Sequence, residues 1–168
     1  SWRVSQDFTL AASEAVMVDH FMLSSASGPG TGDPSFVLDP PVIQYRTRYI
    51  FLVPSGYDGN AVVLSMPAGV TPTLDGAPLA GCARLSVGAV GATTYDAMAC
   101  AVSAGSHTIE ASNPFGLMVV GWASYVSYGY TGGMDFTVVN YECADSSECG
   151  PGEFCSGGIC AACFEFCP

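Results

Sequence analysis

The chain has 168 residues and a formal net charge of −11, with 49% hydrophobic but only 11% charged residues. Such an acidic chain repels phosphate backbones and anionic membrane surfaces, so we expect neither nucleic acid nor membrane partners. The sequence contains no lysine. This absence excludes Schiff-base chemistry and a phosphate loop built on lysine. The length suits one domain with an appendage.

Short segments rich in Val, Ile, Thr, Tyr and Phe, with Gly and Pro between them, predict β-strands. In the clearest of them, residues 42–53, apolar side chains alternate with a mixed face, as in a strand with one buried side. The dipeptides Asp58-Gly59 and Asp75-Gly76 predict hairpin turns, and residues 27–34 predict a loop. The predicted strands cover residues 15–23, 42–53, 61–66, 82–87, 95–102, 108–111, 117–126 and 136–141. The chain is therefore predicted to be all-β, with an antiparallel β-sandwich or jelly-roll-like domain.

The composition changes near Tyr141, after which cysteines crowd the sequence. We expect a β-sandwich over residues 1–141 and a small disulfide-rich module over residues 142–168, because so short a segment cannot bury enough apolar area to fold by itself. The predicted disulfide cysteines of this module are Cys143, Cys149, Cys155, Cys160, Cys163 and Cys167. Their pairing stays open.

Cys82 and Cys100 occupy facing positions on neighbouring predicted strands, and a bridge between them would stabilise the domain by roughly 3 kcal/mol. The motif Cys160-Ala-Ala-Cys163 resembles part of a zinc site, but the number of cysteines favours disulfides. Disulfides form in oxidising compartments, so we expect a secreted or cell-surface protein. We expect no cofactor. No apolar run approaches the roughly 20 residues of a membrane-spanning helix.

An aromatic group near the end of the predicted sandwich is a candidate ligand platform. Its members are Trp122, Tyr125, Tyr128 and Tyr130. Bulky residues occupy the even positions from Met118 to Tyr130 and small residues most of the odd ones, so we favour packing of the even face on the core over a sugar-binding platform.

Other polar residues carry weaker signals. Asp33, Asp58 and Asn60 lie in predicted loops, where we interpret them as turn residues and keep a loop calcium ion as the minor alternative. No partner for catalysis can be placed beside His107, so we interpret this histidine as structural. No nucleophile, metallohydrolase or paired-carboxylate motif is evident, and we expect no enzymatic activity.

Several segments resemble the IgGFc-binding domain family, in the form found in bacterial surface proteins. The matching segments are GDPSFVLDPPVIQYRTRYIFLVPSGYDGNAVVLSMP (32–67), TLDGAPL (73–79), AGSHTIEASNPFGLMVVGW (104–122) and YVSYGYTGGM (125–134). The resemblance covers residues 16–134 and the C-terminal part of the family domain. It implies an extracellular β-sandwich that acts in binding or adhesion without catalysis.

Two functions follow as hypotheses. In the first, the protein is an extracellular structural or adhesion protein that acts through protein contacts, and it self-assembles into a surface fibre by strand addition between copies. In the second, it binds a carbohydrate or glycoprotein through the aromatic group. The first hypothesis is favoured because a lysine-free, charge-poor β-sandwich lacks a common guard of its strand edges.

Overall fold

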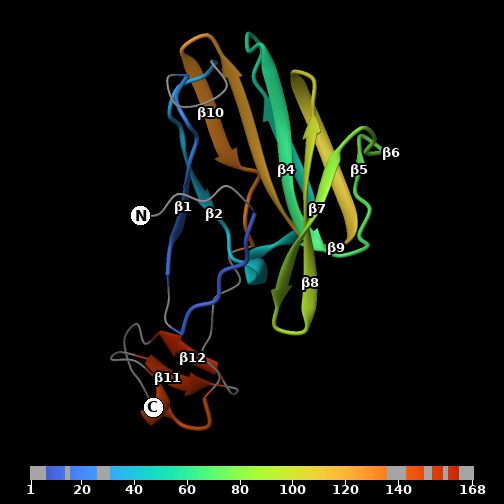
Figure 1. Ribbon diagram of the computed structural model, residues 1–168. Helices are drawn as coiled ribbons and strands as arrows, with labels where there is room; N and C mark the ends of the chain where they lie inside the picture. Colours follow the sequence, from blue (N-terminus) through green and yellow to red (C-terminus); the bar gives the residue numbers. More distant parts are fainter. Residues whose placement is uncertain are drawn as a thin grey trace. The chain divides into compact units, whose positions relative to one another are not determined.

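The computed structural model describes residues 7–13, 16–25, 31–135, 143–149, 153–156 and 159–162 (Figure 1). These residues form antiparallel strands and two short 3₁₀ turns, and they include no helix long and apolar enough to cross a membrane. The chain divides into two compact units, Ser1–Asp135 and Phe136–Pro168. The all-β prediction is confirmed, and the division falls slightly before the boundary predicted near Tyr141.

The described part of the first unit contains strands that alternate with turns rich in glycine. In chain order these strands are β1 (Val18–Phe21), β2 (Phe36–Asp39), β3 (Arg46–Val53), β4 (Gly59–Pro67), β5 (Thr73–Leu74), β6 (Ala77–Pro78), β7 (Ala83–Val90), β8 (Thr93–Ala101), β9 (Gly105–Ala123) and β10 (Val126–Thr131), with the 3₁₀ turn η1 (Val42–Gln44) before β3.

Strand β9 belongs to both sheets of the sandwich. Its first part pairs with β3 and β5, and its last part pairs with β4 and β10. The first sheet therefore has the order β6-β5-β9-β3, and the second has the order β10-β9-β4-β8-β7. A single strand of 19 residues thus joins the two layers.

The core lies between these two sheets. Alternate residues of β4 point into it, as the period of a strand with one buried face requires. The same alternation in β3, β8 and β9 supplies the other core side chains. The core contains Tyr49, Phe51, Val53, Val62, Leu64, Met66, Val70, Met98, Cys100, Ile109, Phe115, Leu117 and Val119.

A third layer covers part of the other face of the second sheet. It consists of the β1–β2 hairpin, η1 and residues 7–13, with β1 and β2 drawn in blue tones in Figure 1. The β2 residue Val37 is only 3% exposed, and a Cβ atom added to Gly129 would lie 2.4 Å from its Cγ2 atom. The hairpin thus packs closely on β10 at a position where only glycine fits.

Several strand predictions differ from the structure. The short strands β5 and β6 are not among the predicted ones, and the predicted strand 117–126 runs through the turn that separates β9 from β10. Residues 108–111 and 117–126 were predicted as separate strands because Asn113-Pro114 lies between them, but β9 runs through this dipeptide. Residues 42–44 form η1 instead of the start of a strand. Strand β2 was not predicted at all, because its four residues lie between prolines at positions 34 and 40.

The two predicted hairpin turns have different outcomes. Asp75 and Gly76 both have positive φ and connect β5 to β6 in a two-residue hairpin, as predicted. Asp58-Gly59 does not close a hairpin, because β3 pairs with β9 and β4 pairs with β8 and β9. The predicted strand 136–141 lies outside the described residues.

The described part of the second unit is a small disulfide-bonded hairpin. It comprises β11 (Glu153–Ser156), β12 (Ile159–Ala162) and the 3₁₀ turn η2 (Ser146–Glu148). The Asp145 side chain caps this turn by accepting a hydrogen bond from the Ser147 N–H at 2.7 Å. Cysteine pairs join Cys143 to Cys155 and Cys149 to Cys160. Cys163 and Cys167 lie outside the described residues.

Candidate functional site

Strand β7 is one edge of the second sheet, and the other edge, β10, packs against the β1–β2 hairpin. Strand β7 has eight residues, and the strand that pairs with it in the described part of the chain is β8. A disulfide between Cys82 and Cys100 fastens its start to β8. An edge strand presents unpaired backbone N–H and C=O groups, which can pair with a strand of another chain.

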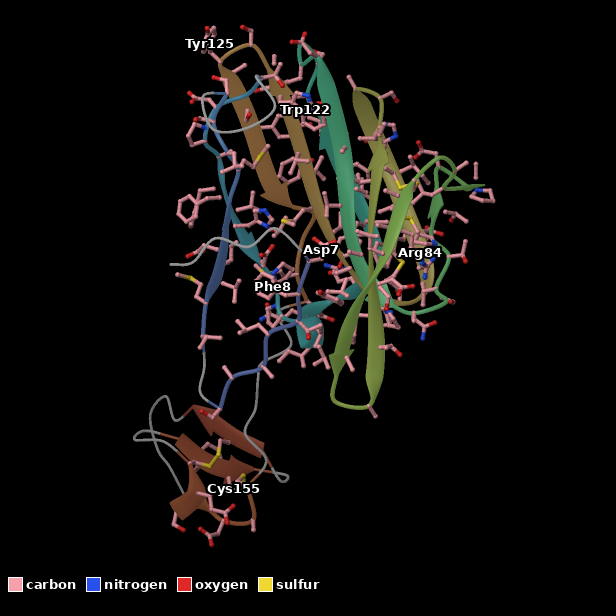
Figure 2. All side chains as sticks on the ribbon, in the orientation of Figure 1. Asp7, Phe8, Arg84, Trp122, Tyr125 and Cys155 are labelled. Carbon is pink, nitrogen blue, oxygen red and sulfur yellow. A yellow bond between two sulfur atoms is a disulfide. The ribbon has the colours of Figure 1, made fainter. Side chains whose placement is uncertain are left out.

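The only charged side chain of β7 is directed inward. Arg84 forms an ion pair with Asp96 at 2.8 Å and also donates a hydrogen bond from Nη1 to the Val70 carbonyl at 2.8 Å (Figure 2 labels Arg84). Leu85, the next residue, is 61% exposed. The first half of β7 therefore has neither an outward charge nor a proline to discourage pairing, while a bulge between Ser86 and Gly88 disturbs the second half.

The edge of β3 is better guarded. Arg48 is exposed there and forms an ion pair with Glu110 of β9 at 2.6 Å. The Tyr130 hydroxyl donates a hydrogen bond to the Leu52 carbonyl at 2.5 Å and so occupies a backbone acceptor of β3. Of these two eight-residue edges, β7 is thus the more open to a further strand.

The four aromatic candidates do not form one surface. Trp122 pairs with Ser127 across the β9–β10 ladder, and neighbouring residues of a strand point to opposite faces. Tyr128 and Tyr130 consequently lie on the core side, whereas Trp122 lies on the other face, where its indole fills the space above Gly59. Tyr125 stands in the turn between the strands and is 80% exposed.

Residues of β9 also reverse the expectation drawn from side-chain size. The odd positions of β9, most of them predicted to be the small and outward ones, form the buried face. Leu117, Val119 and Ala123 are 1%, 0% and 9% exposed. The bulkier Met118, Val120 and Trp122 are half-buried on the opposite face. Side-chain size did not predict the core-facing side of β9, because the third layer also covers part of the opposite face and bulky residues pack there as well.

Tyr128 uses its polar group inside the fold. Its hydroxyl donates to Asn60 Oδ1 at 2.8 Å, and its ring packs edge-on against Tyr57 at 4.7 Å. Burial, together with the neighbouring tyrosines, raises the pKa of Tyr128 to about 12. Asn60, a calcium candidate, therefore has its carbonyl oxygen engaged by a tyrosine.

The other calcium candidates are not gathered into a cluster. Asp33 and Asp58 are exposed, and neither belongs to a group of three potential metal ligands of the His, Cys, Asp or Glu type within the described ranges. The one such group there is Cys143, Cys149 and Cys160, whose sulfur atoms lie within 4.8 Å of one another. All three sulfurs are in disulfides, so this group reflects packed cystines and not a thiolate zinc site.

Two histidine–aspartate pairs occur in the first unit. His107 Nδ1 lies 2.7 Å from Asp75 Oδ2, and its Nε2 lies 2.9 Å from the Ser103 carbonyl. The Thr108 N–H and His107 hydrogen bonds lower the pKa of Asp75. His107 is 9% exposed and holds the β5–β6 turn against β9, in keeping with a structural role.

The second pair is looser. His20 Nδ1 lies 3.9 Å from Asp39 Oδ2, beyond hydrogen-bond distance, on the side of the β1–β2 hairpin that faces the second sheet. Burial raises the pKa of Asp39, and the nearby His20 only partly opposes this. Sequence reasoning did not identify this pair, because His20 and Asp39 are brought together only by the pairing of β1 with β2.

The fold defines the class of the protein as a disulfide-bonded β-sandwich module with an open strand edge. A family model described as IgGFc binding protein matches residues 2–121, and the chain belongs to this family. The match begins before, and ends before, the residues 16–134 inferred from the sequence, so it includes most of the first unit but neither β10 nor the second unit. No curated protein and no solved structure matches the chain.

Membership of this family indicates a protein-binding, non-enzymatic role. The disulfides fit an extracellular location, since such bonds persist in oxidising compartments.

Proposed function

We propose that the protein binds other chains by strand addition at β7, and that its partner in this contact is a second copy of itself. The observation that carries this proposal is the first half of β7, an edge with an exposed leucine and no outward charge. Natural edge strands usually discourage pairing with lysine or proline on the edge, with an inward-pointing charge or with a bulge. Strand β7 has the inward-pointing Arg84, whose charge Asp96 neutralises, but it has neither lysine nor proline. The chain has no lysine for this purpose.

Two copies that pair β7 with β7 would form a closed dimer, because such a contact uses the same surface on both subunits. A fibre requires a second, different contact. For this contact we propose the terminal segments, residues 1–10 and 143–168. The proposed dimer thus needs only the β7 contact, whereas the proposed self-assembling surface fibre needs both the β7 contact and the terminal contact.

The test is the assembly state of the intact, oxidised chain. Sedimentation velocity and negative-stain electron microscopy should show dimers or longer assemblies for the wild type. Leu85→Lys adds a charge to the open edge and should weaken association at least tenfold. Ile50→Lys is the matched control, because Ile50 is 65% exposed on the guarded strand β3.

Two outcomes contradict the proposal. One is a monodisperse wild-type monomer at high concentration. The other is equal loss of assembly in Leu85→Lys and Ile50→Lys, which would place the contact elsewhere or make it a general effect of added charge. Assemblies that persist as dimers but never as fibres would retain the β7 contact and remove the terminal one.

A further inference from the structure

A cavity of about 400 Å³ lies between the second sheet and the third layer. Its floor is the face of the sheet opposite the core, where Val63, Ala97 and Met118 line it. Its walls come from η1, β1, the end of β7 and the N-terminal segment that includes Asp7 and Phe8, both labelled in Figure 2. Cavities of this size hold small organic molecules.

The Tyr45 ring packs on a glycine of the sheet at the edge of the cavity. Gly116 lies beneath the ring of Tyr45, and a Cβ atom added to Gly116 would come within 2.7 Å of that ring. The Tyr45 hydroxyl forms a hydrogen bond of 2.5 Å with the Ser65 Oγ atom on the same face. Tyr45 is thus held in place as a wall of the cavity, with its polar atom satisfied.

Most of the lining is apolar, and Asp39 supplies a half-buried carboxylate. The Asp39 side chain is 32% exposed, and the basic group beside it is the His20 imidazole, 3.9 Å away. Burial without a close hydrogen bond penalises the charged carboxylate, which is why the pKa of Asp39 is raised. A positive group in the cavity would relieve this penalty.

The negative charge around the cavity also favours a positively charged ligand. Asp7 also lines the cavity, and the whole chain has a net charge of −11. Arg48 and Arg84 pair with Glu110 and Asp96, so these two guanidinium groups are engaged elsewhere in the sandwich. Tyr45 and Tyr95 add aromatic rings, whose faces attract organic cations.

We propose that this cavity is a binding site for a small hydrophobic cation, an alkyl- or arylammonium whose apolar body lies on the sheet and whose charge pairs with Asp39. The apolar lining would contact the hydrocarbon part of the ligand, and the Asp39 carboxylate would pair with its ammonium group. The cavity lining does not include the first half of β7, so this proposal and the proposed β7 contact can fail independently. Residues 7–10 are shared with the proposed terminal contact of the fibre.

Isothermal titration of the intact chain with octylammonium, 1-octanol and octanoate tests the proposal, since these probes share an alkyl chain and differ in charge. Octylammonium should bind at least tenfold more tightly than 1-octanol, and octanoate should bind most weakly. Asp39→Asn should remove the preference for the amine while it preserves binding of the alcohol. Asp33→Asn is the matched control, because Asp33 is an exposed carboxylate that does not line the cavity.

A second variant tests the location. Ala97→Leu narrows the floor and should weaken octylammonium and 1-octanol together, with near-ultraviolet circular dichroism to verify that the sandwich is intact. Equal affinity for the amine and the alcohol in the wild type overturns the proposal, as does equal loss of the preference in Asp33→Asn. Binding of a lysine-rich peptide without binding of octylammonium also overturns it, because the site would then recognise protein and not a small cation.

Discussion

The two histidine–aspartate pairs show how differently two regions of the first unit are built: the first sheet, where His107 meets Asp75, and the β1–β2 hairpin, where His20 lies near Asp39. Asp75 receives hydrogen bonds from Thr108 and His107, and the pKa of its carboxyl is lowered. Asp39 has a histidine neighbour without a hydrogen bond, and burial raises the pKa of its carboxyl. The pKa values of the two aspartates are therefore shifted in opposite directions, although each has a histidine neighbour. The Asp75 carboxylate is fixed by hydrogen bonds, whereas the Asp39 carboxylate lies beside a cavity with His20 at a longer distance.

Packing should be tighter in the core than beside the cavity, and this difference gives the largest expected effect on the free energy of unfolding. Leu64 and Val63 are neighbours on β4 and both border the cavity, but the Leu64 side chain is 0% exposed within the core whereas Val63 faces the opposite side of the sheet. Leu64→Ala should lower the free energy of unfolding by about 3 kcal/mol through lost burial and a new void. Val63→Ala should cost about 1 kcal/mol. Guanidinium unfolding of the oxidised chain measures both, and equal losses would mean that the third layer packs as tightly as the core.

A hydrogen bond inside the fold provides the next, smaller effect. Tyr128→Phe removes the donor to Asn60 Oδ1 and leaves this acceptor unpaired, so the free energy of unfolding should fall by about 1 kcal/mol. Tyr125→Phe should change it little, because Tyr125 is exposed in the turn. The denaturant midpoints of the two variants make the comparison. A larger effect at Tyr125 would contradict the assignment of Tyr128 to the structural network.

The smallest effect is in the pH dependence of stability. A lowered pKa means that the Asp75 contribution is present above its ordinary value of 3.8 and is lost as the pH falls through the folded-state pKa. Asp75→Asn should therefore flatten the acid side of the stability profile. The raised pKa of Asp39 has the opposite sign: its contribution is present below 3.8 and is lost as the pH rises through the folded-state pKa.

Asp39→Asn should accordingly lessen the loss of stability on going from acid to neutral pH. Thermal unfolding midpoints of the wild type and both variants, followed between acid and neutral pH, would measure these opposite changes. Parallel shifts of the two profiles would contradict the contrast between a hydrogen-bonded and a desolvated carboxylate.

Local patterns predicted β3, β4, β7, β8 and the Asp75-Gly76 hairpin, because alternation and turn chemistry are properties of neighbouring residues. They did not predict the turn between β9 and β10. They did not predict that β9 continues through Asn113-Pro114, since a proline is compatible with a strand only when the sheet context leaves its nitrogen unpaired. They also placed a hairpin at Asp58-Gly59, where the chain instead crosses to other strand partners.

The candidate sites were harder to predict for the same reason. The β7 edge depends on the order of strands in the sheet, which a single strand does not specify. The cavity is lined from distant segments, with His20 and Asp39 on a hairpin whose second strand was not recognised. The aromatic candidates were visible as residue types, but the register of β9 with β10 decides which face each occupies.

The sharing of β9 by both sheets has a consequence for how the first unit loses its structure. Neither sheet can come apart while the other remains whole, because the same 19-residue strand supplies hydrogen bonds to both. Partial melting of one layer is thereby discouraged, and the sandwich should disassemble in one cooperative transition. Such all-or-none behaviour leaves few half-open forms for a protease to cut, which suits a domain whose disulfides fit an extracellular location.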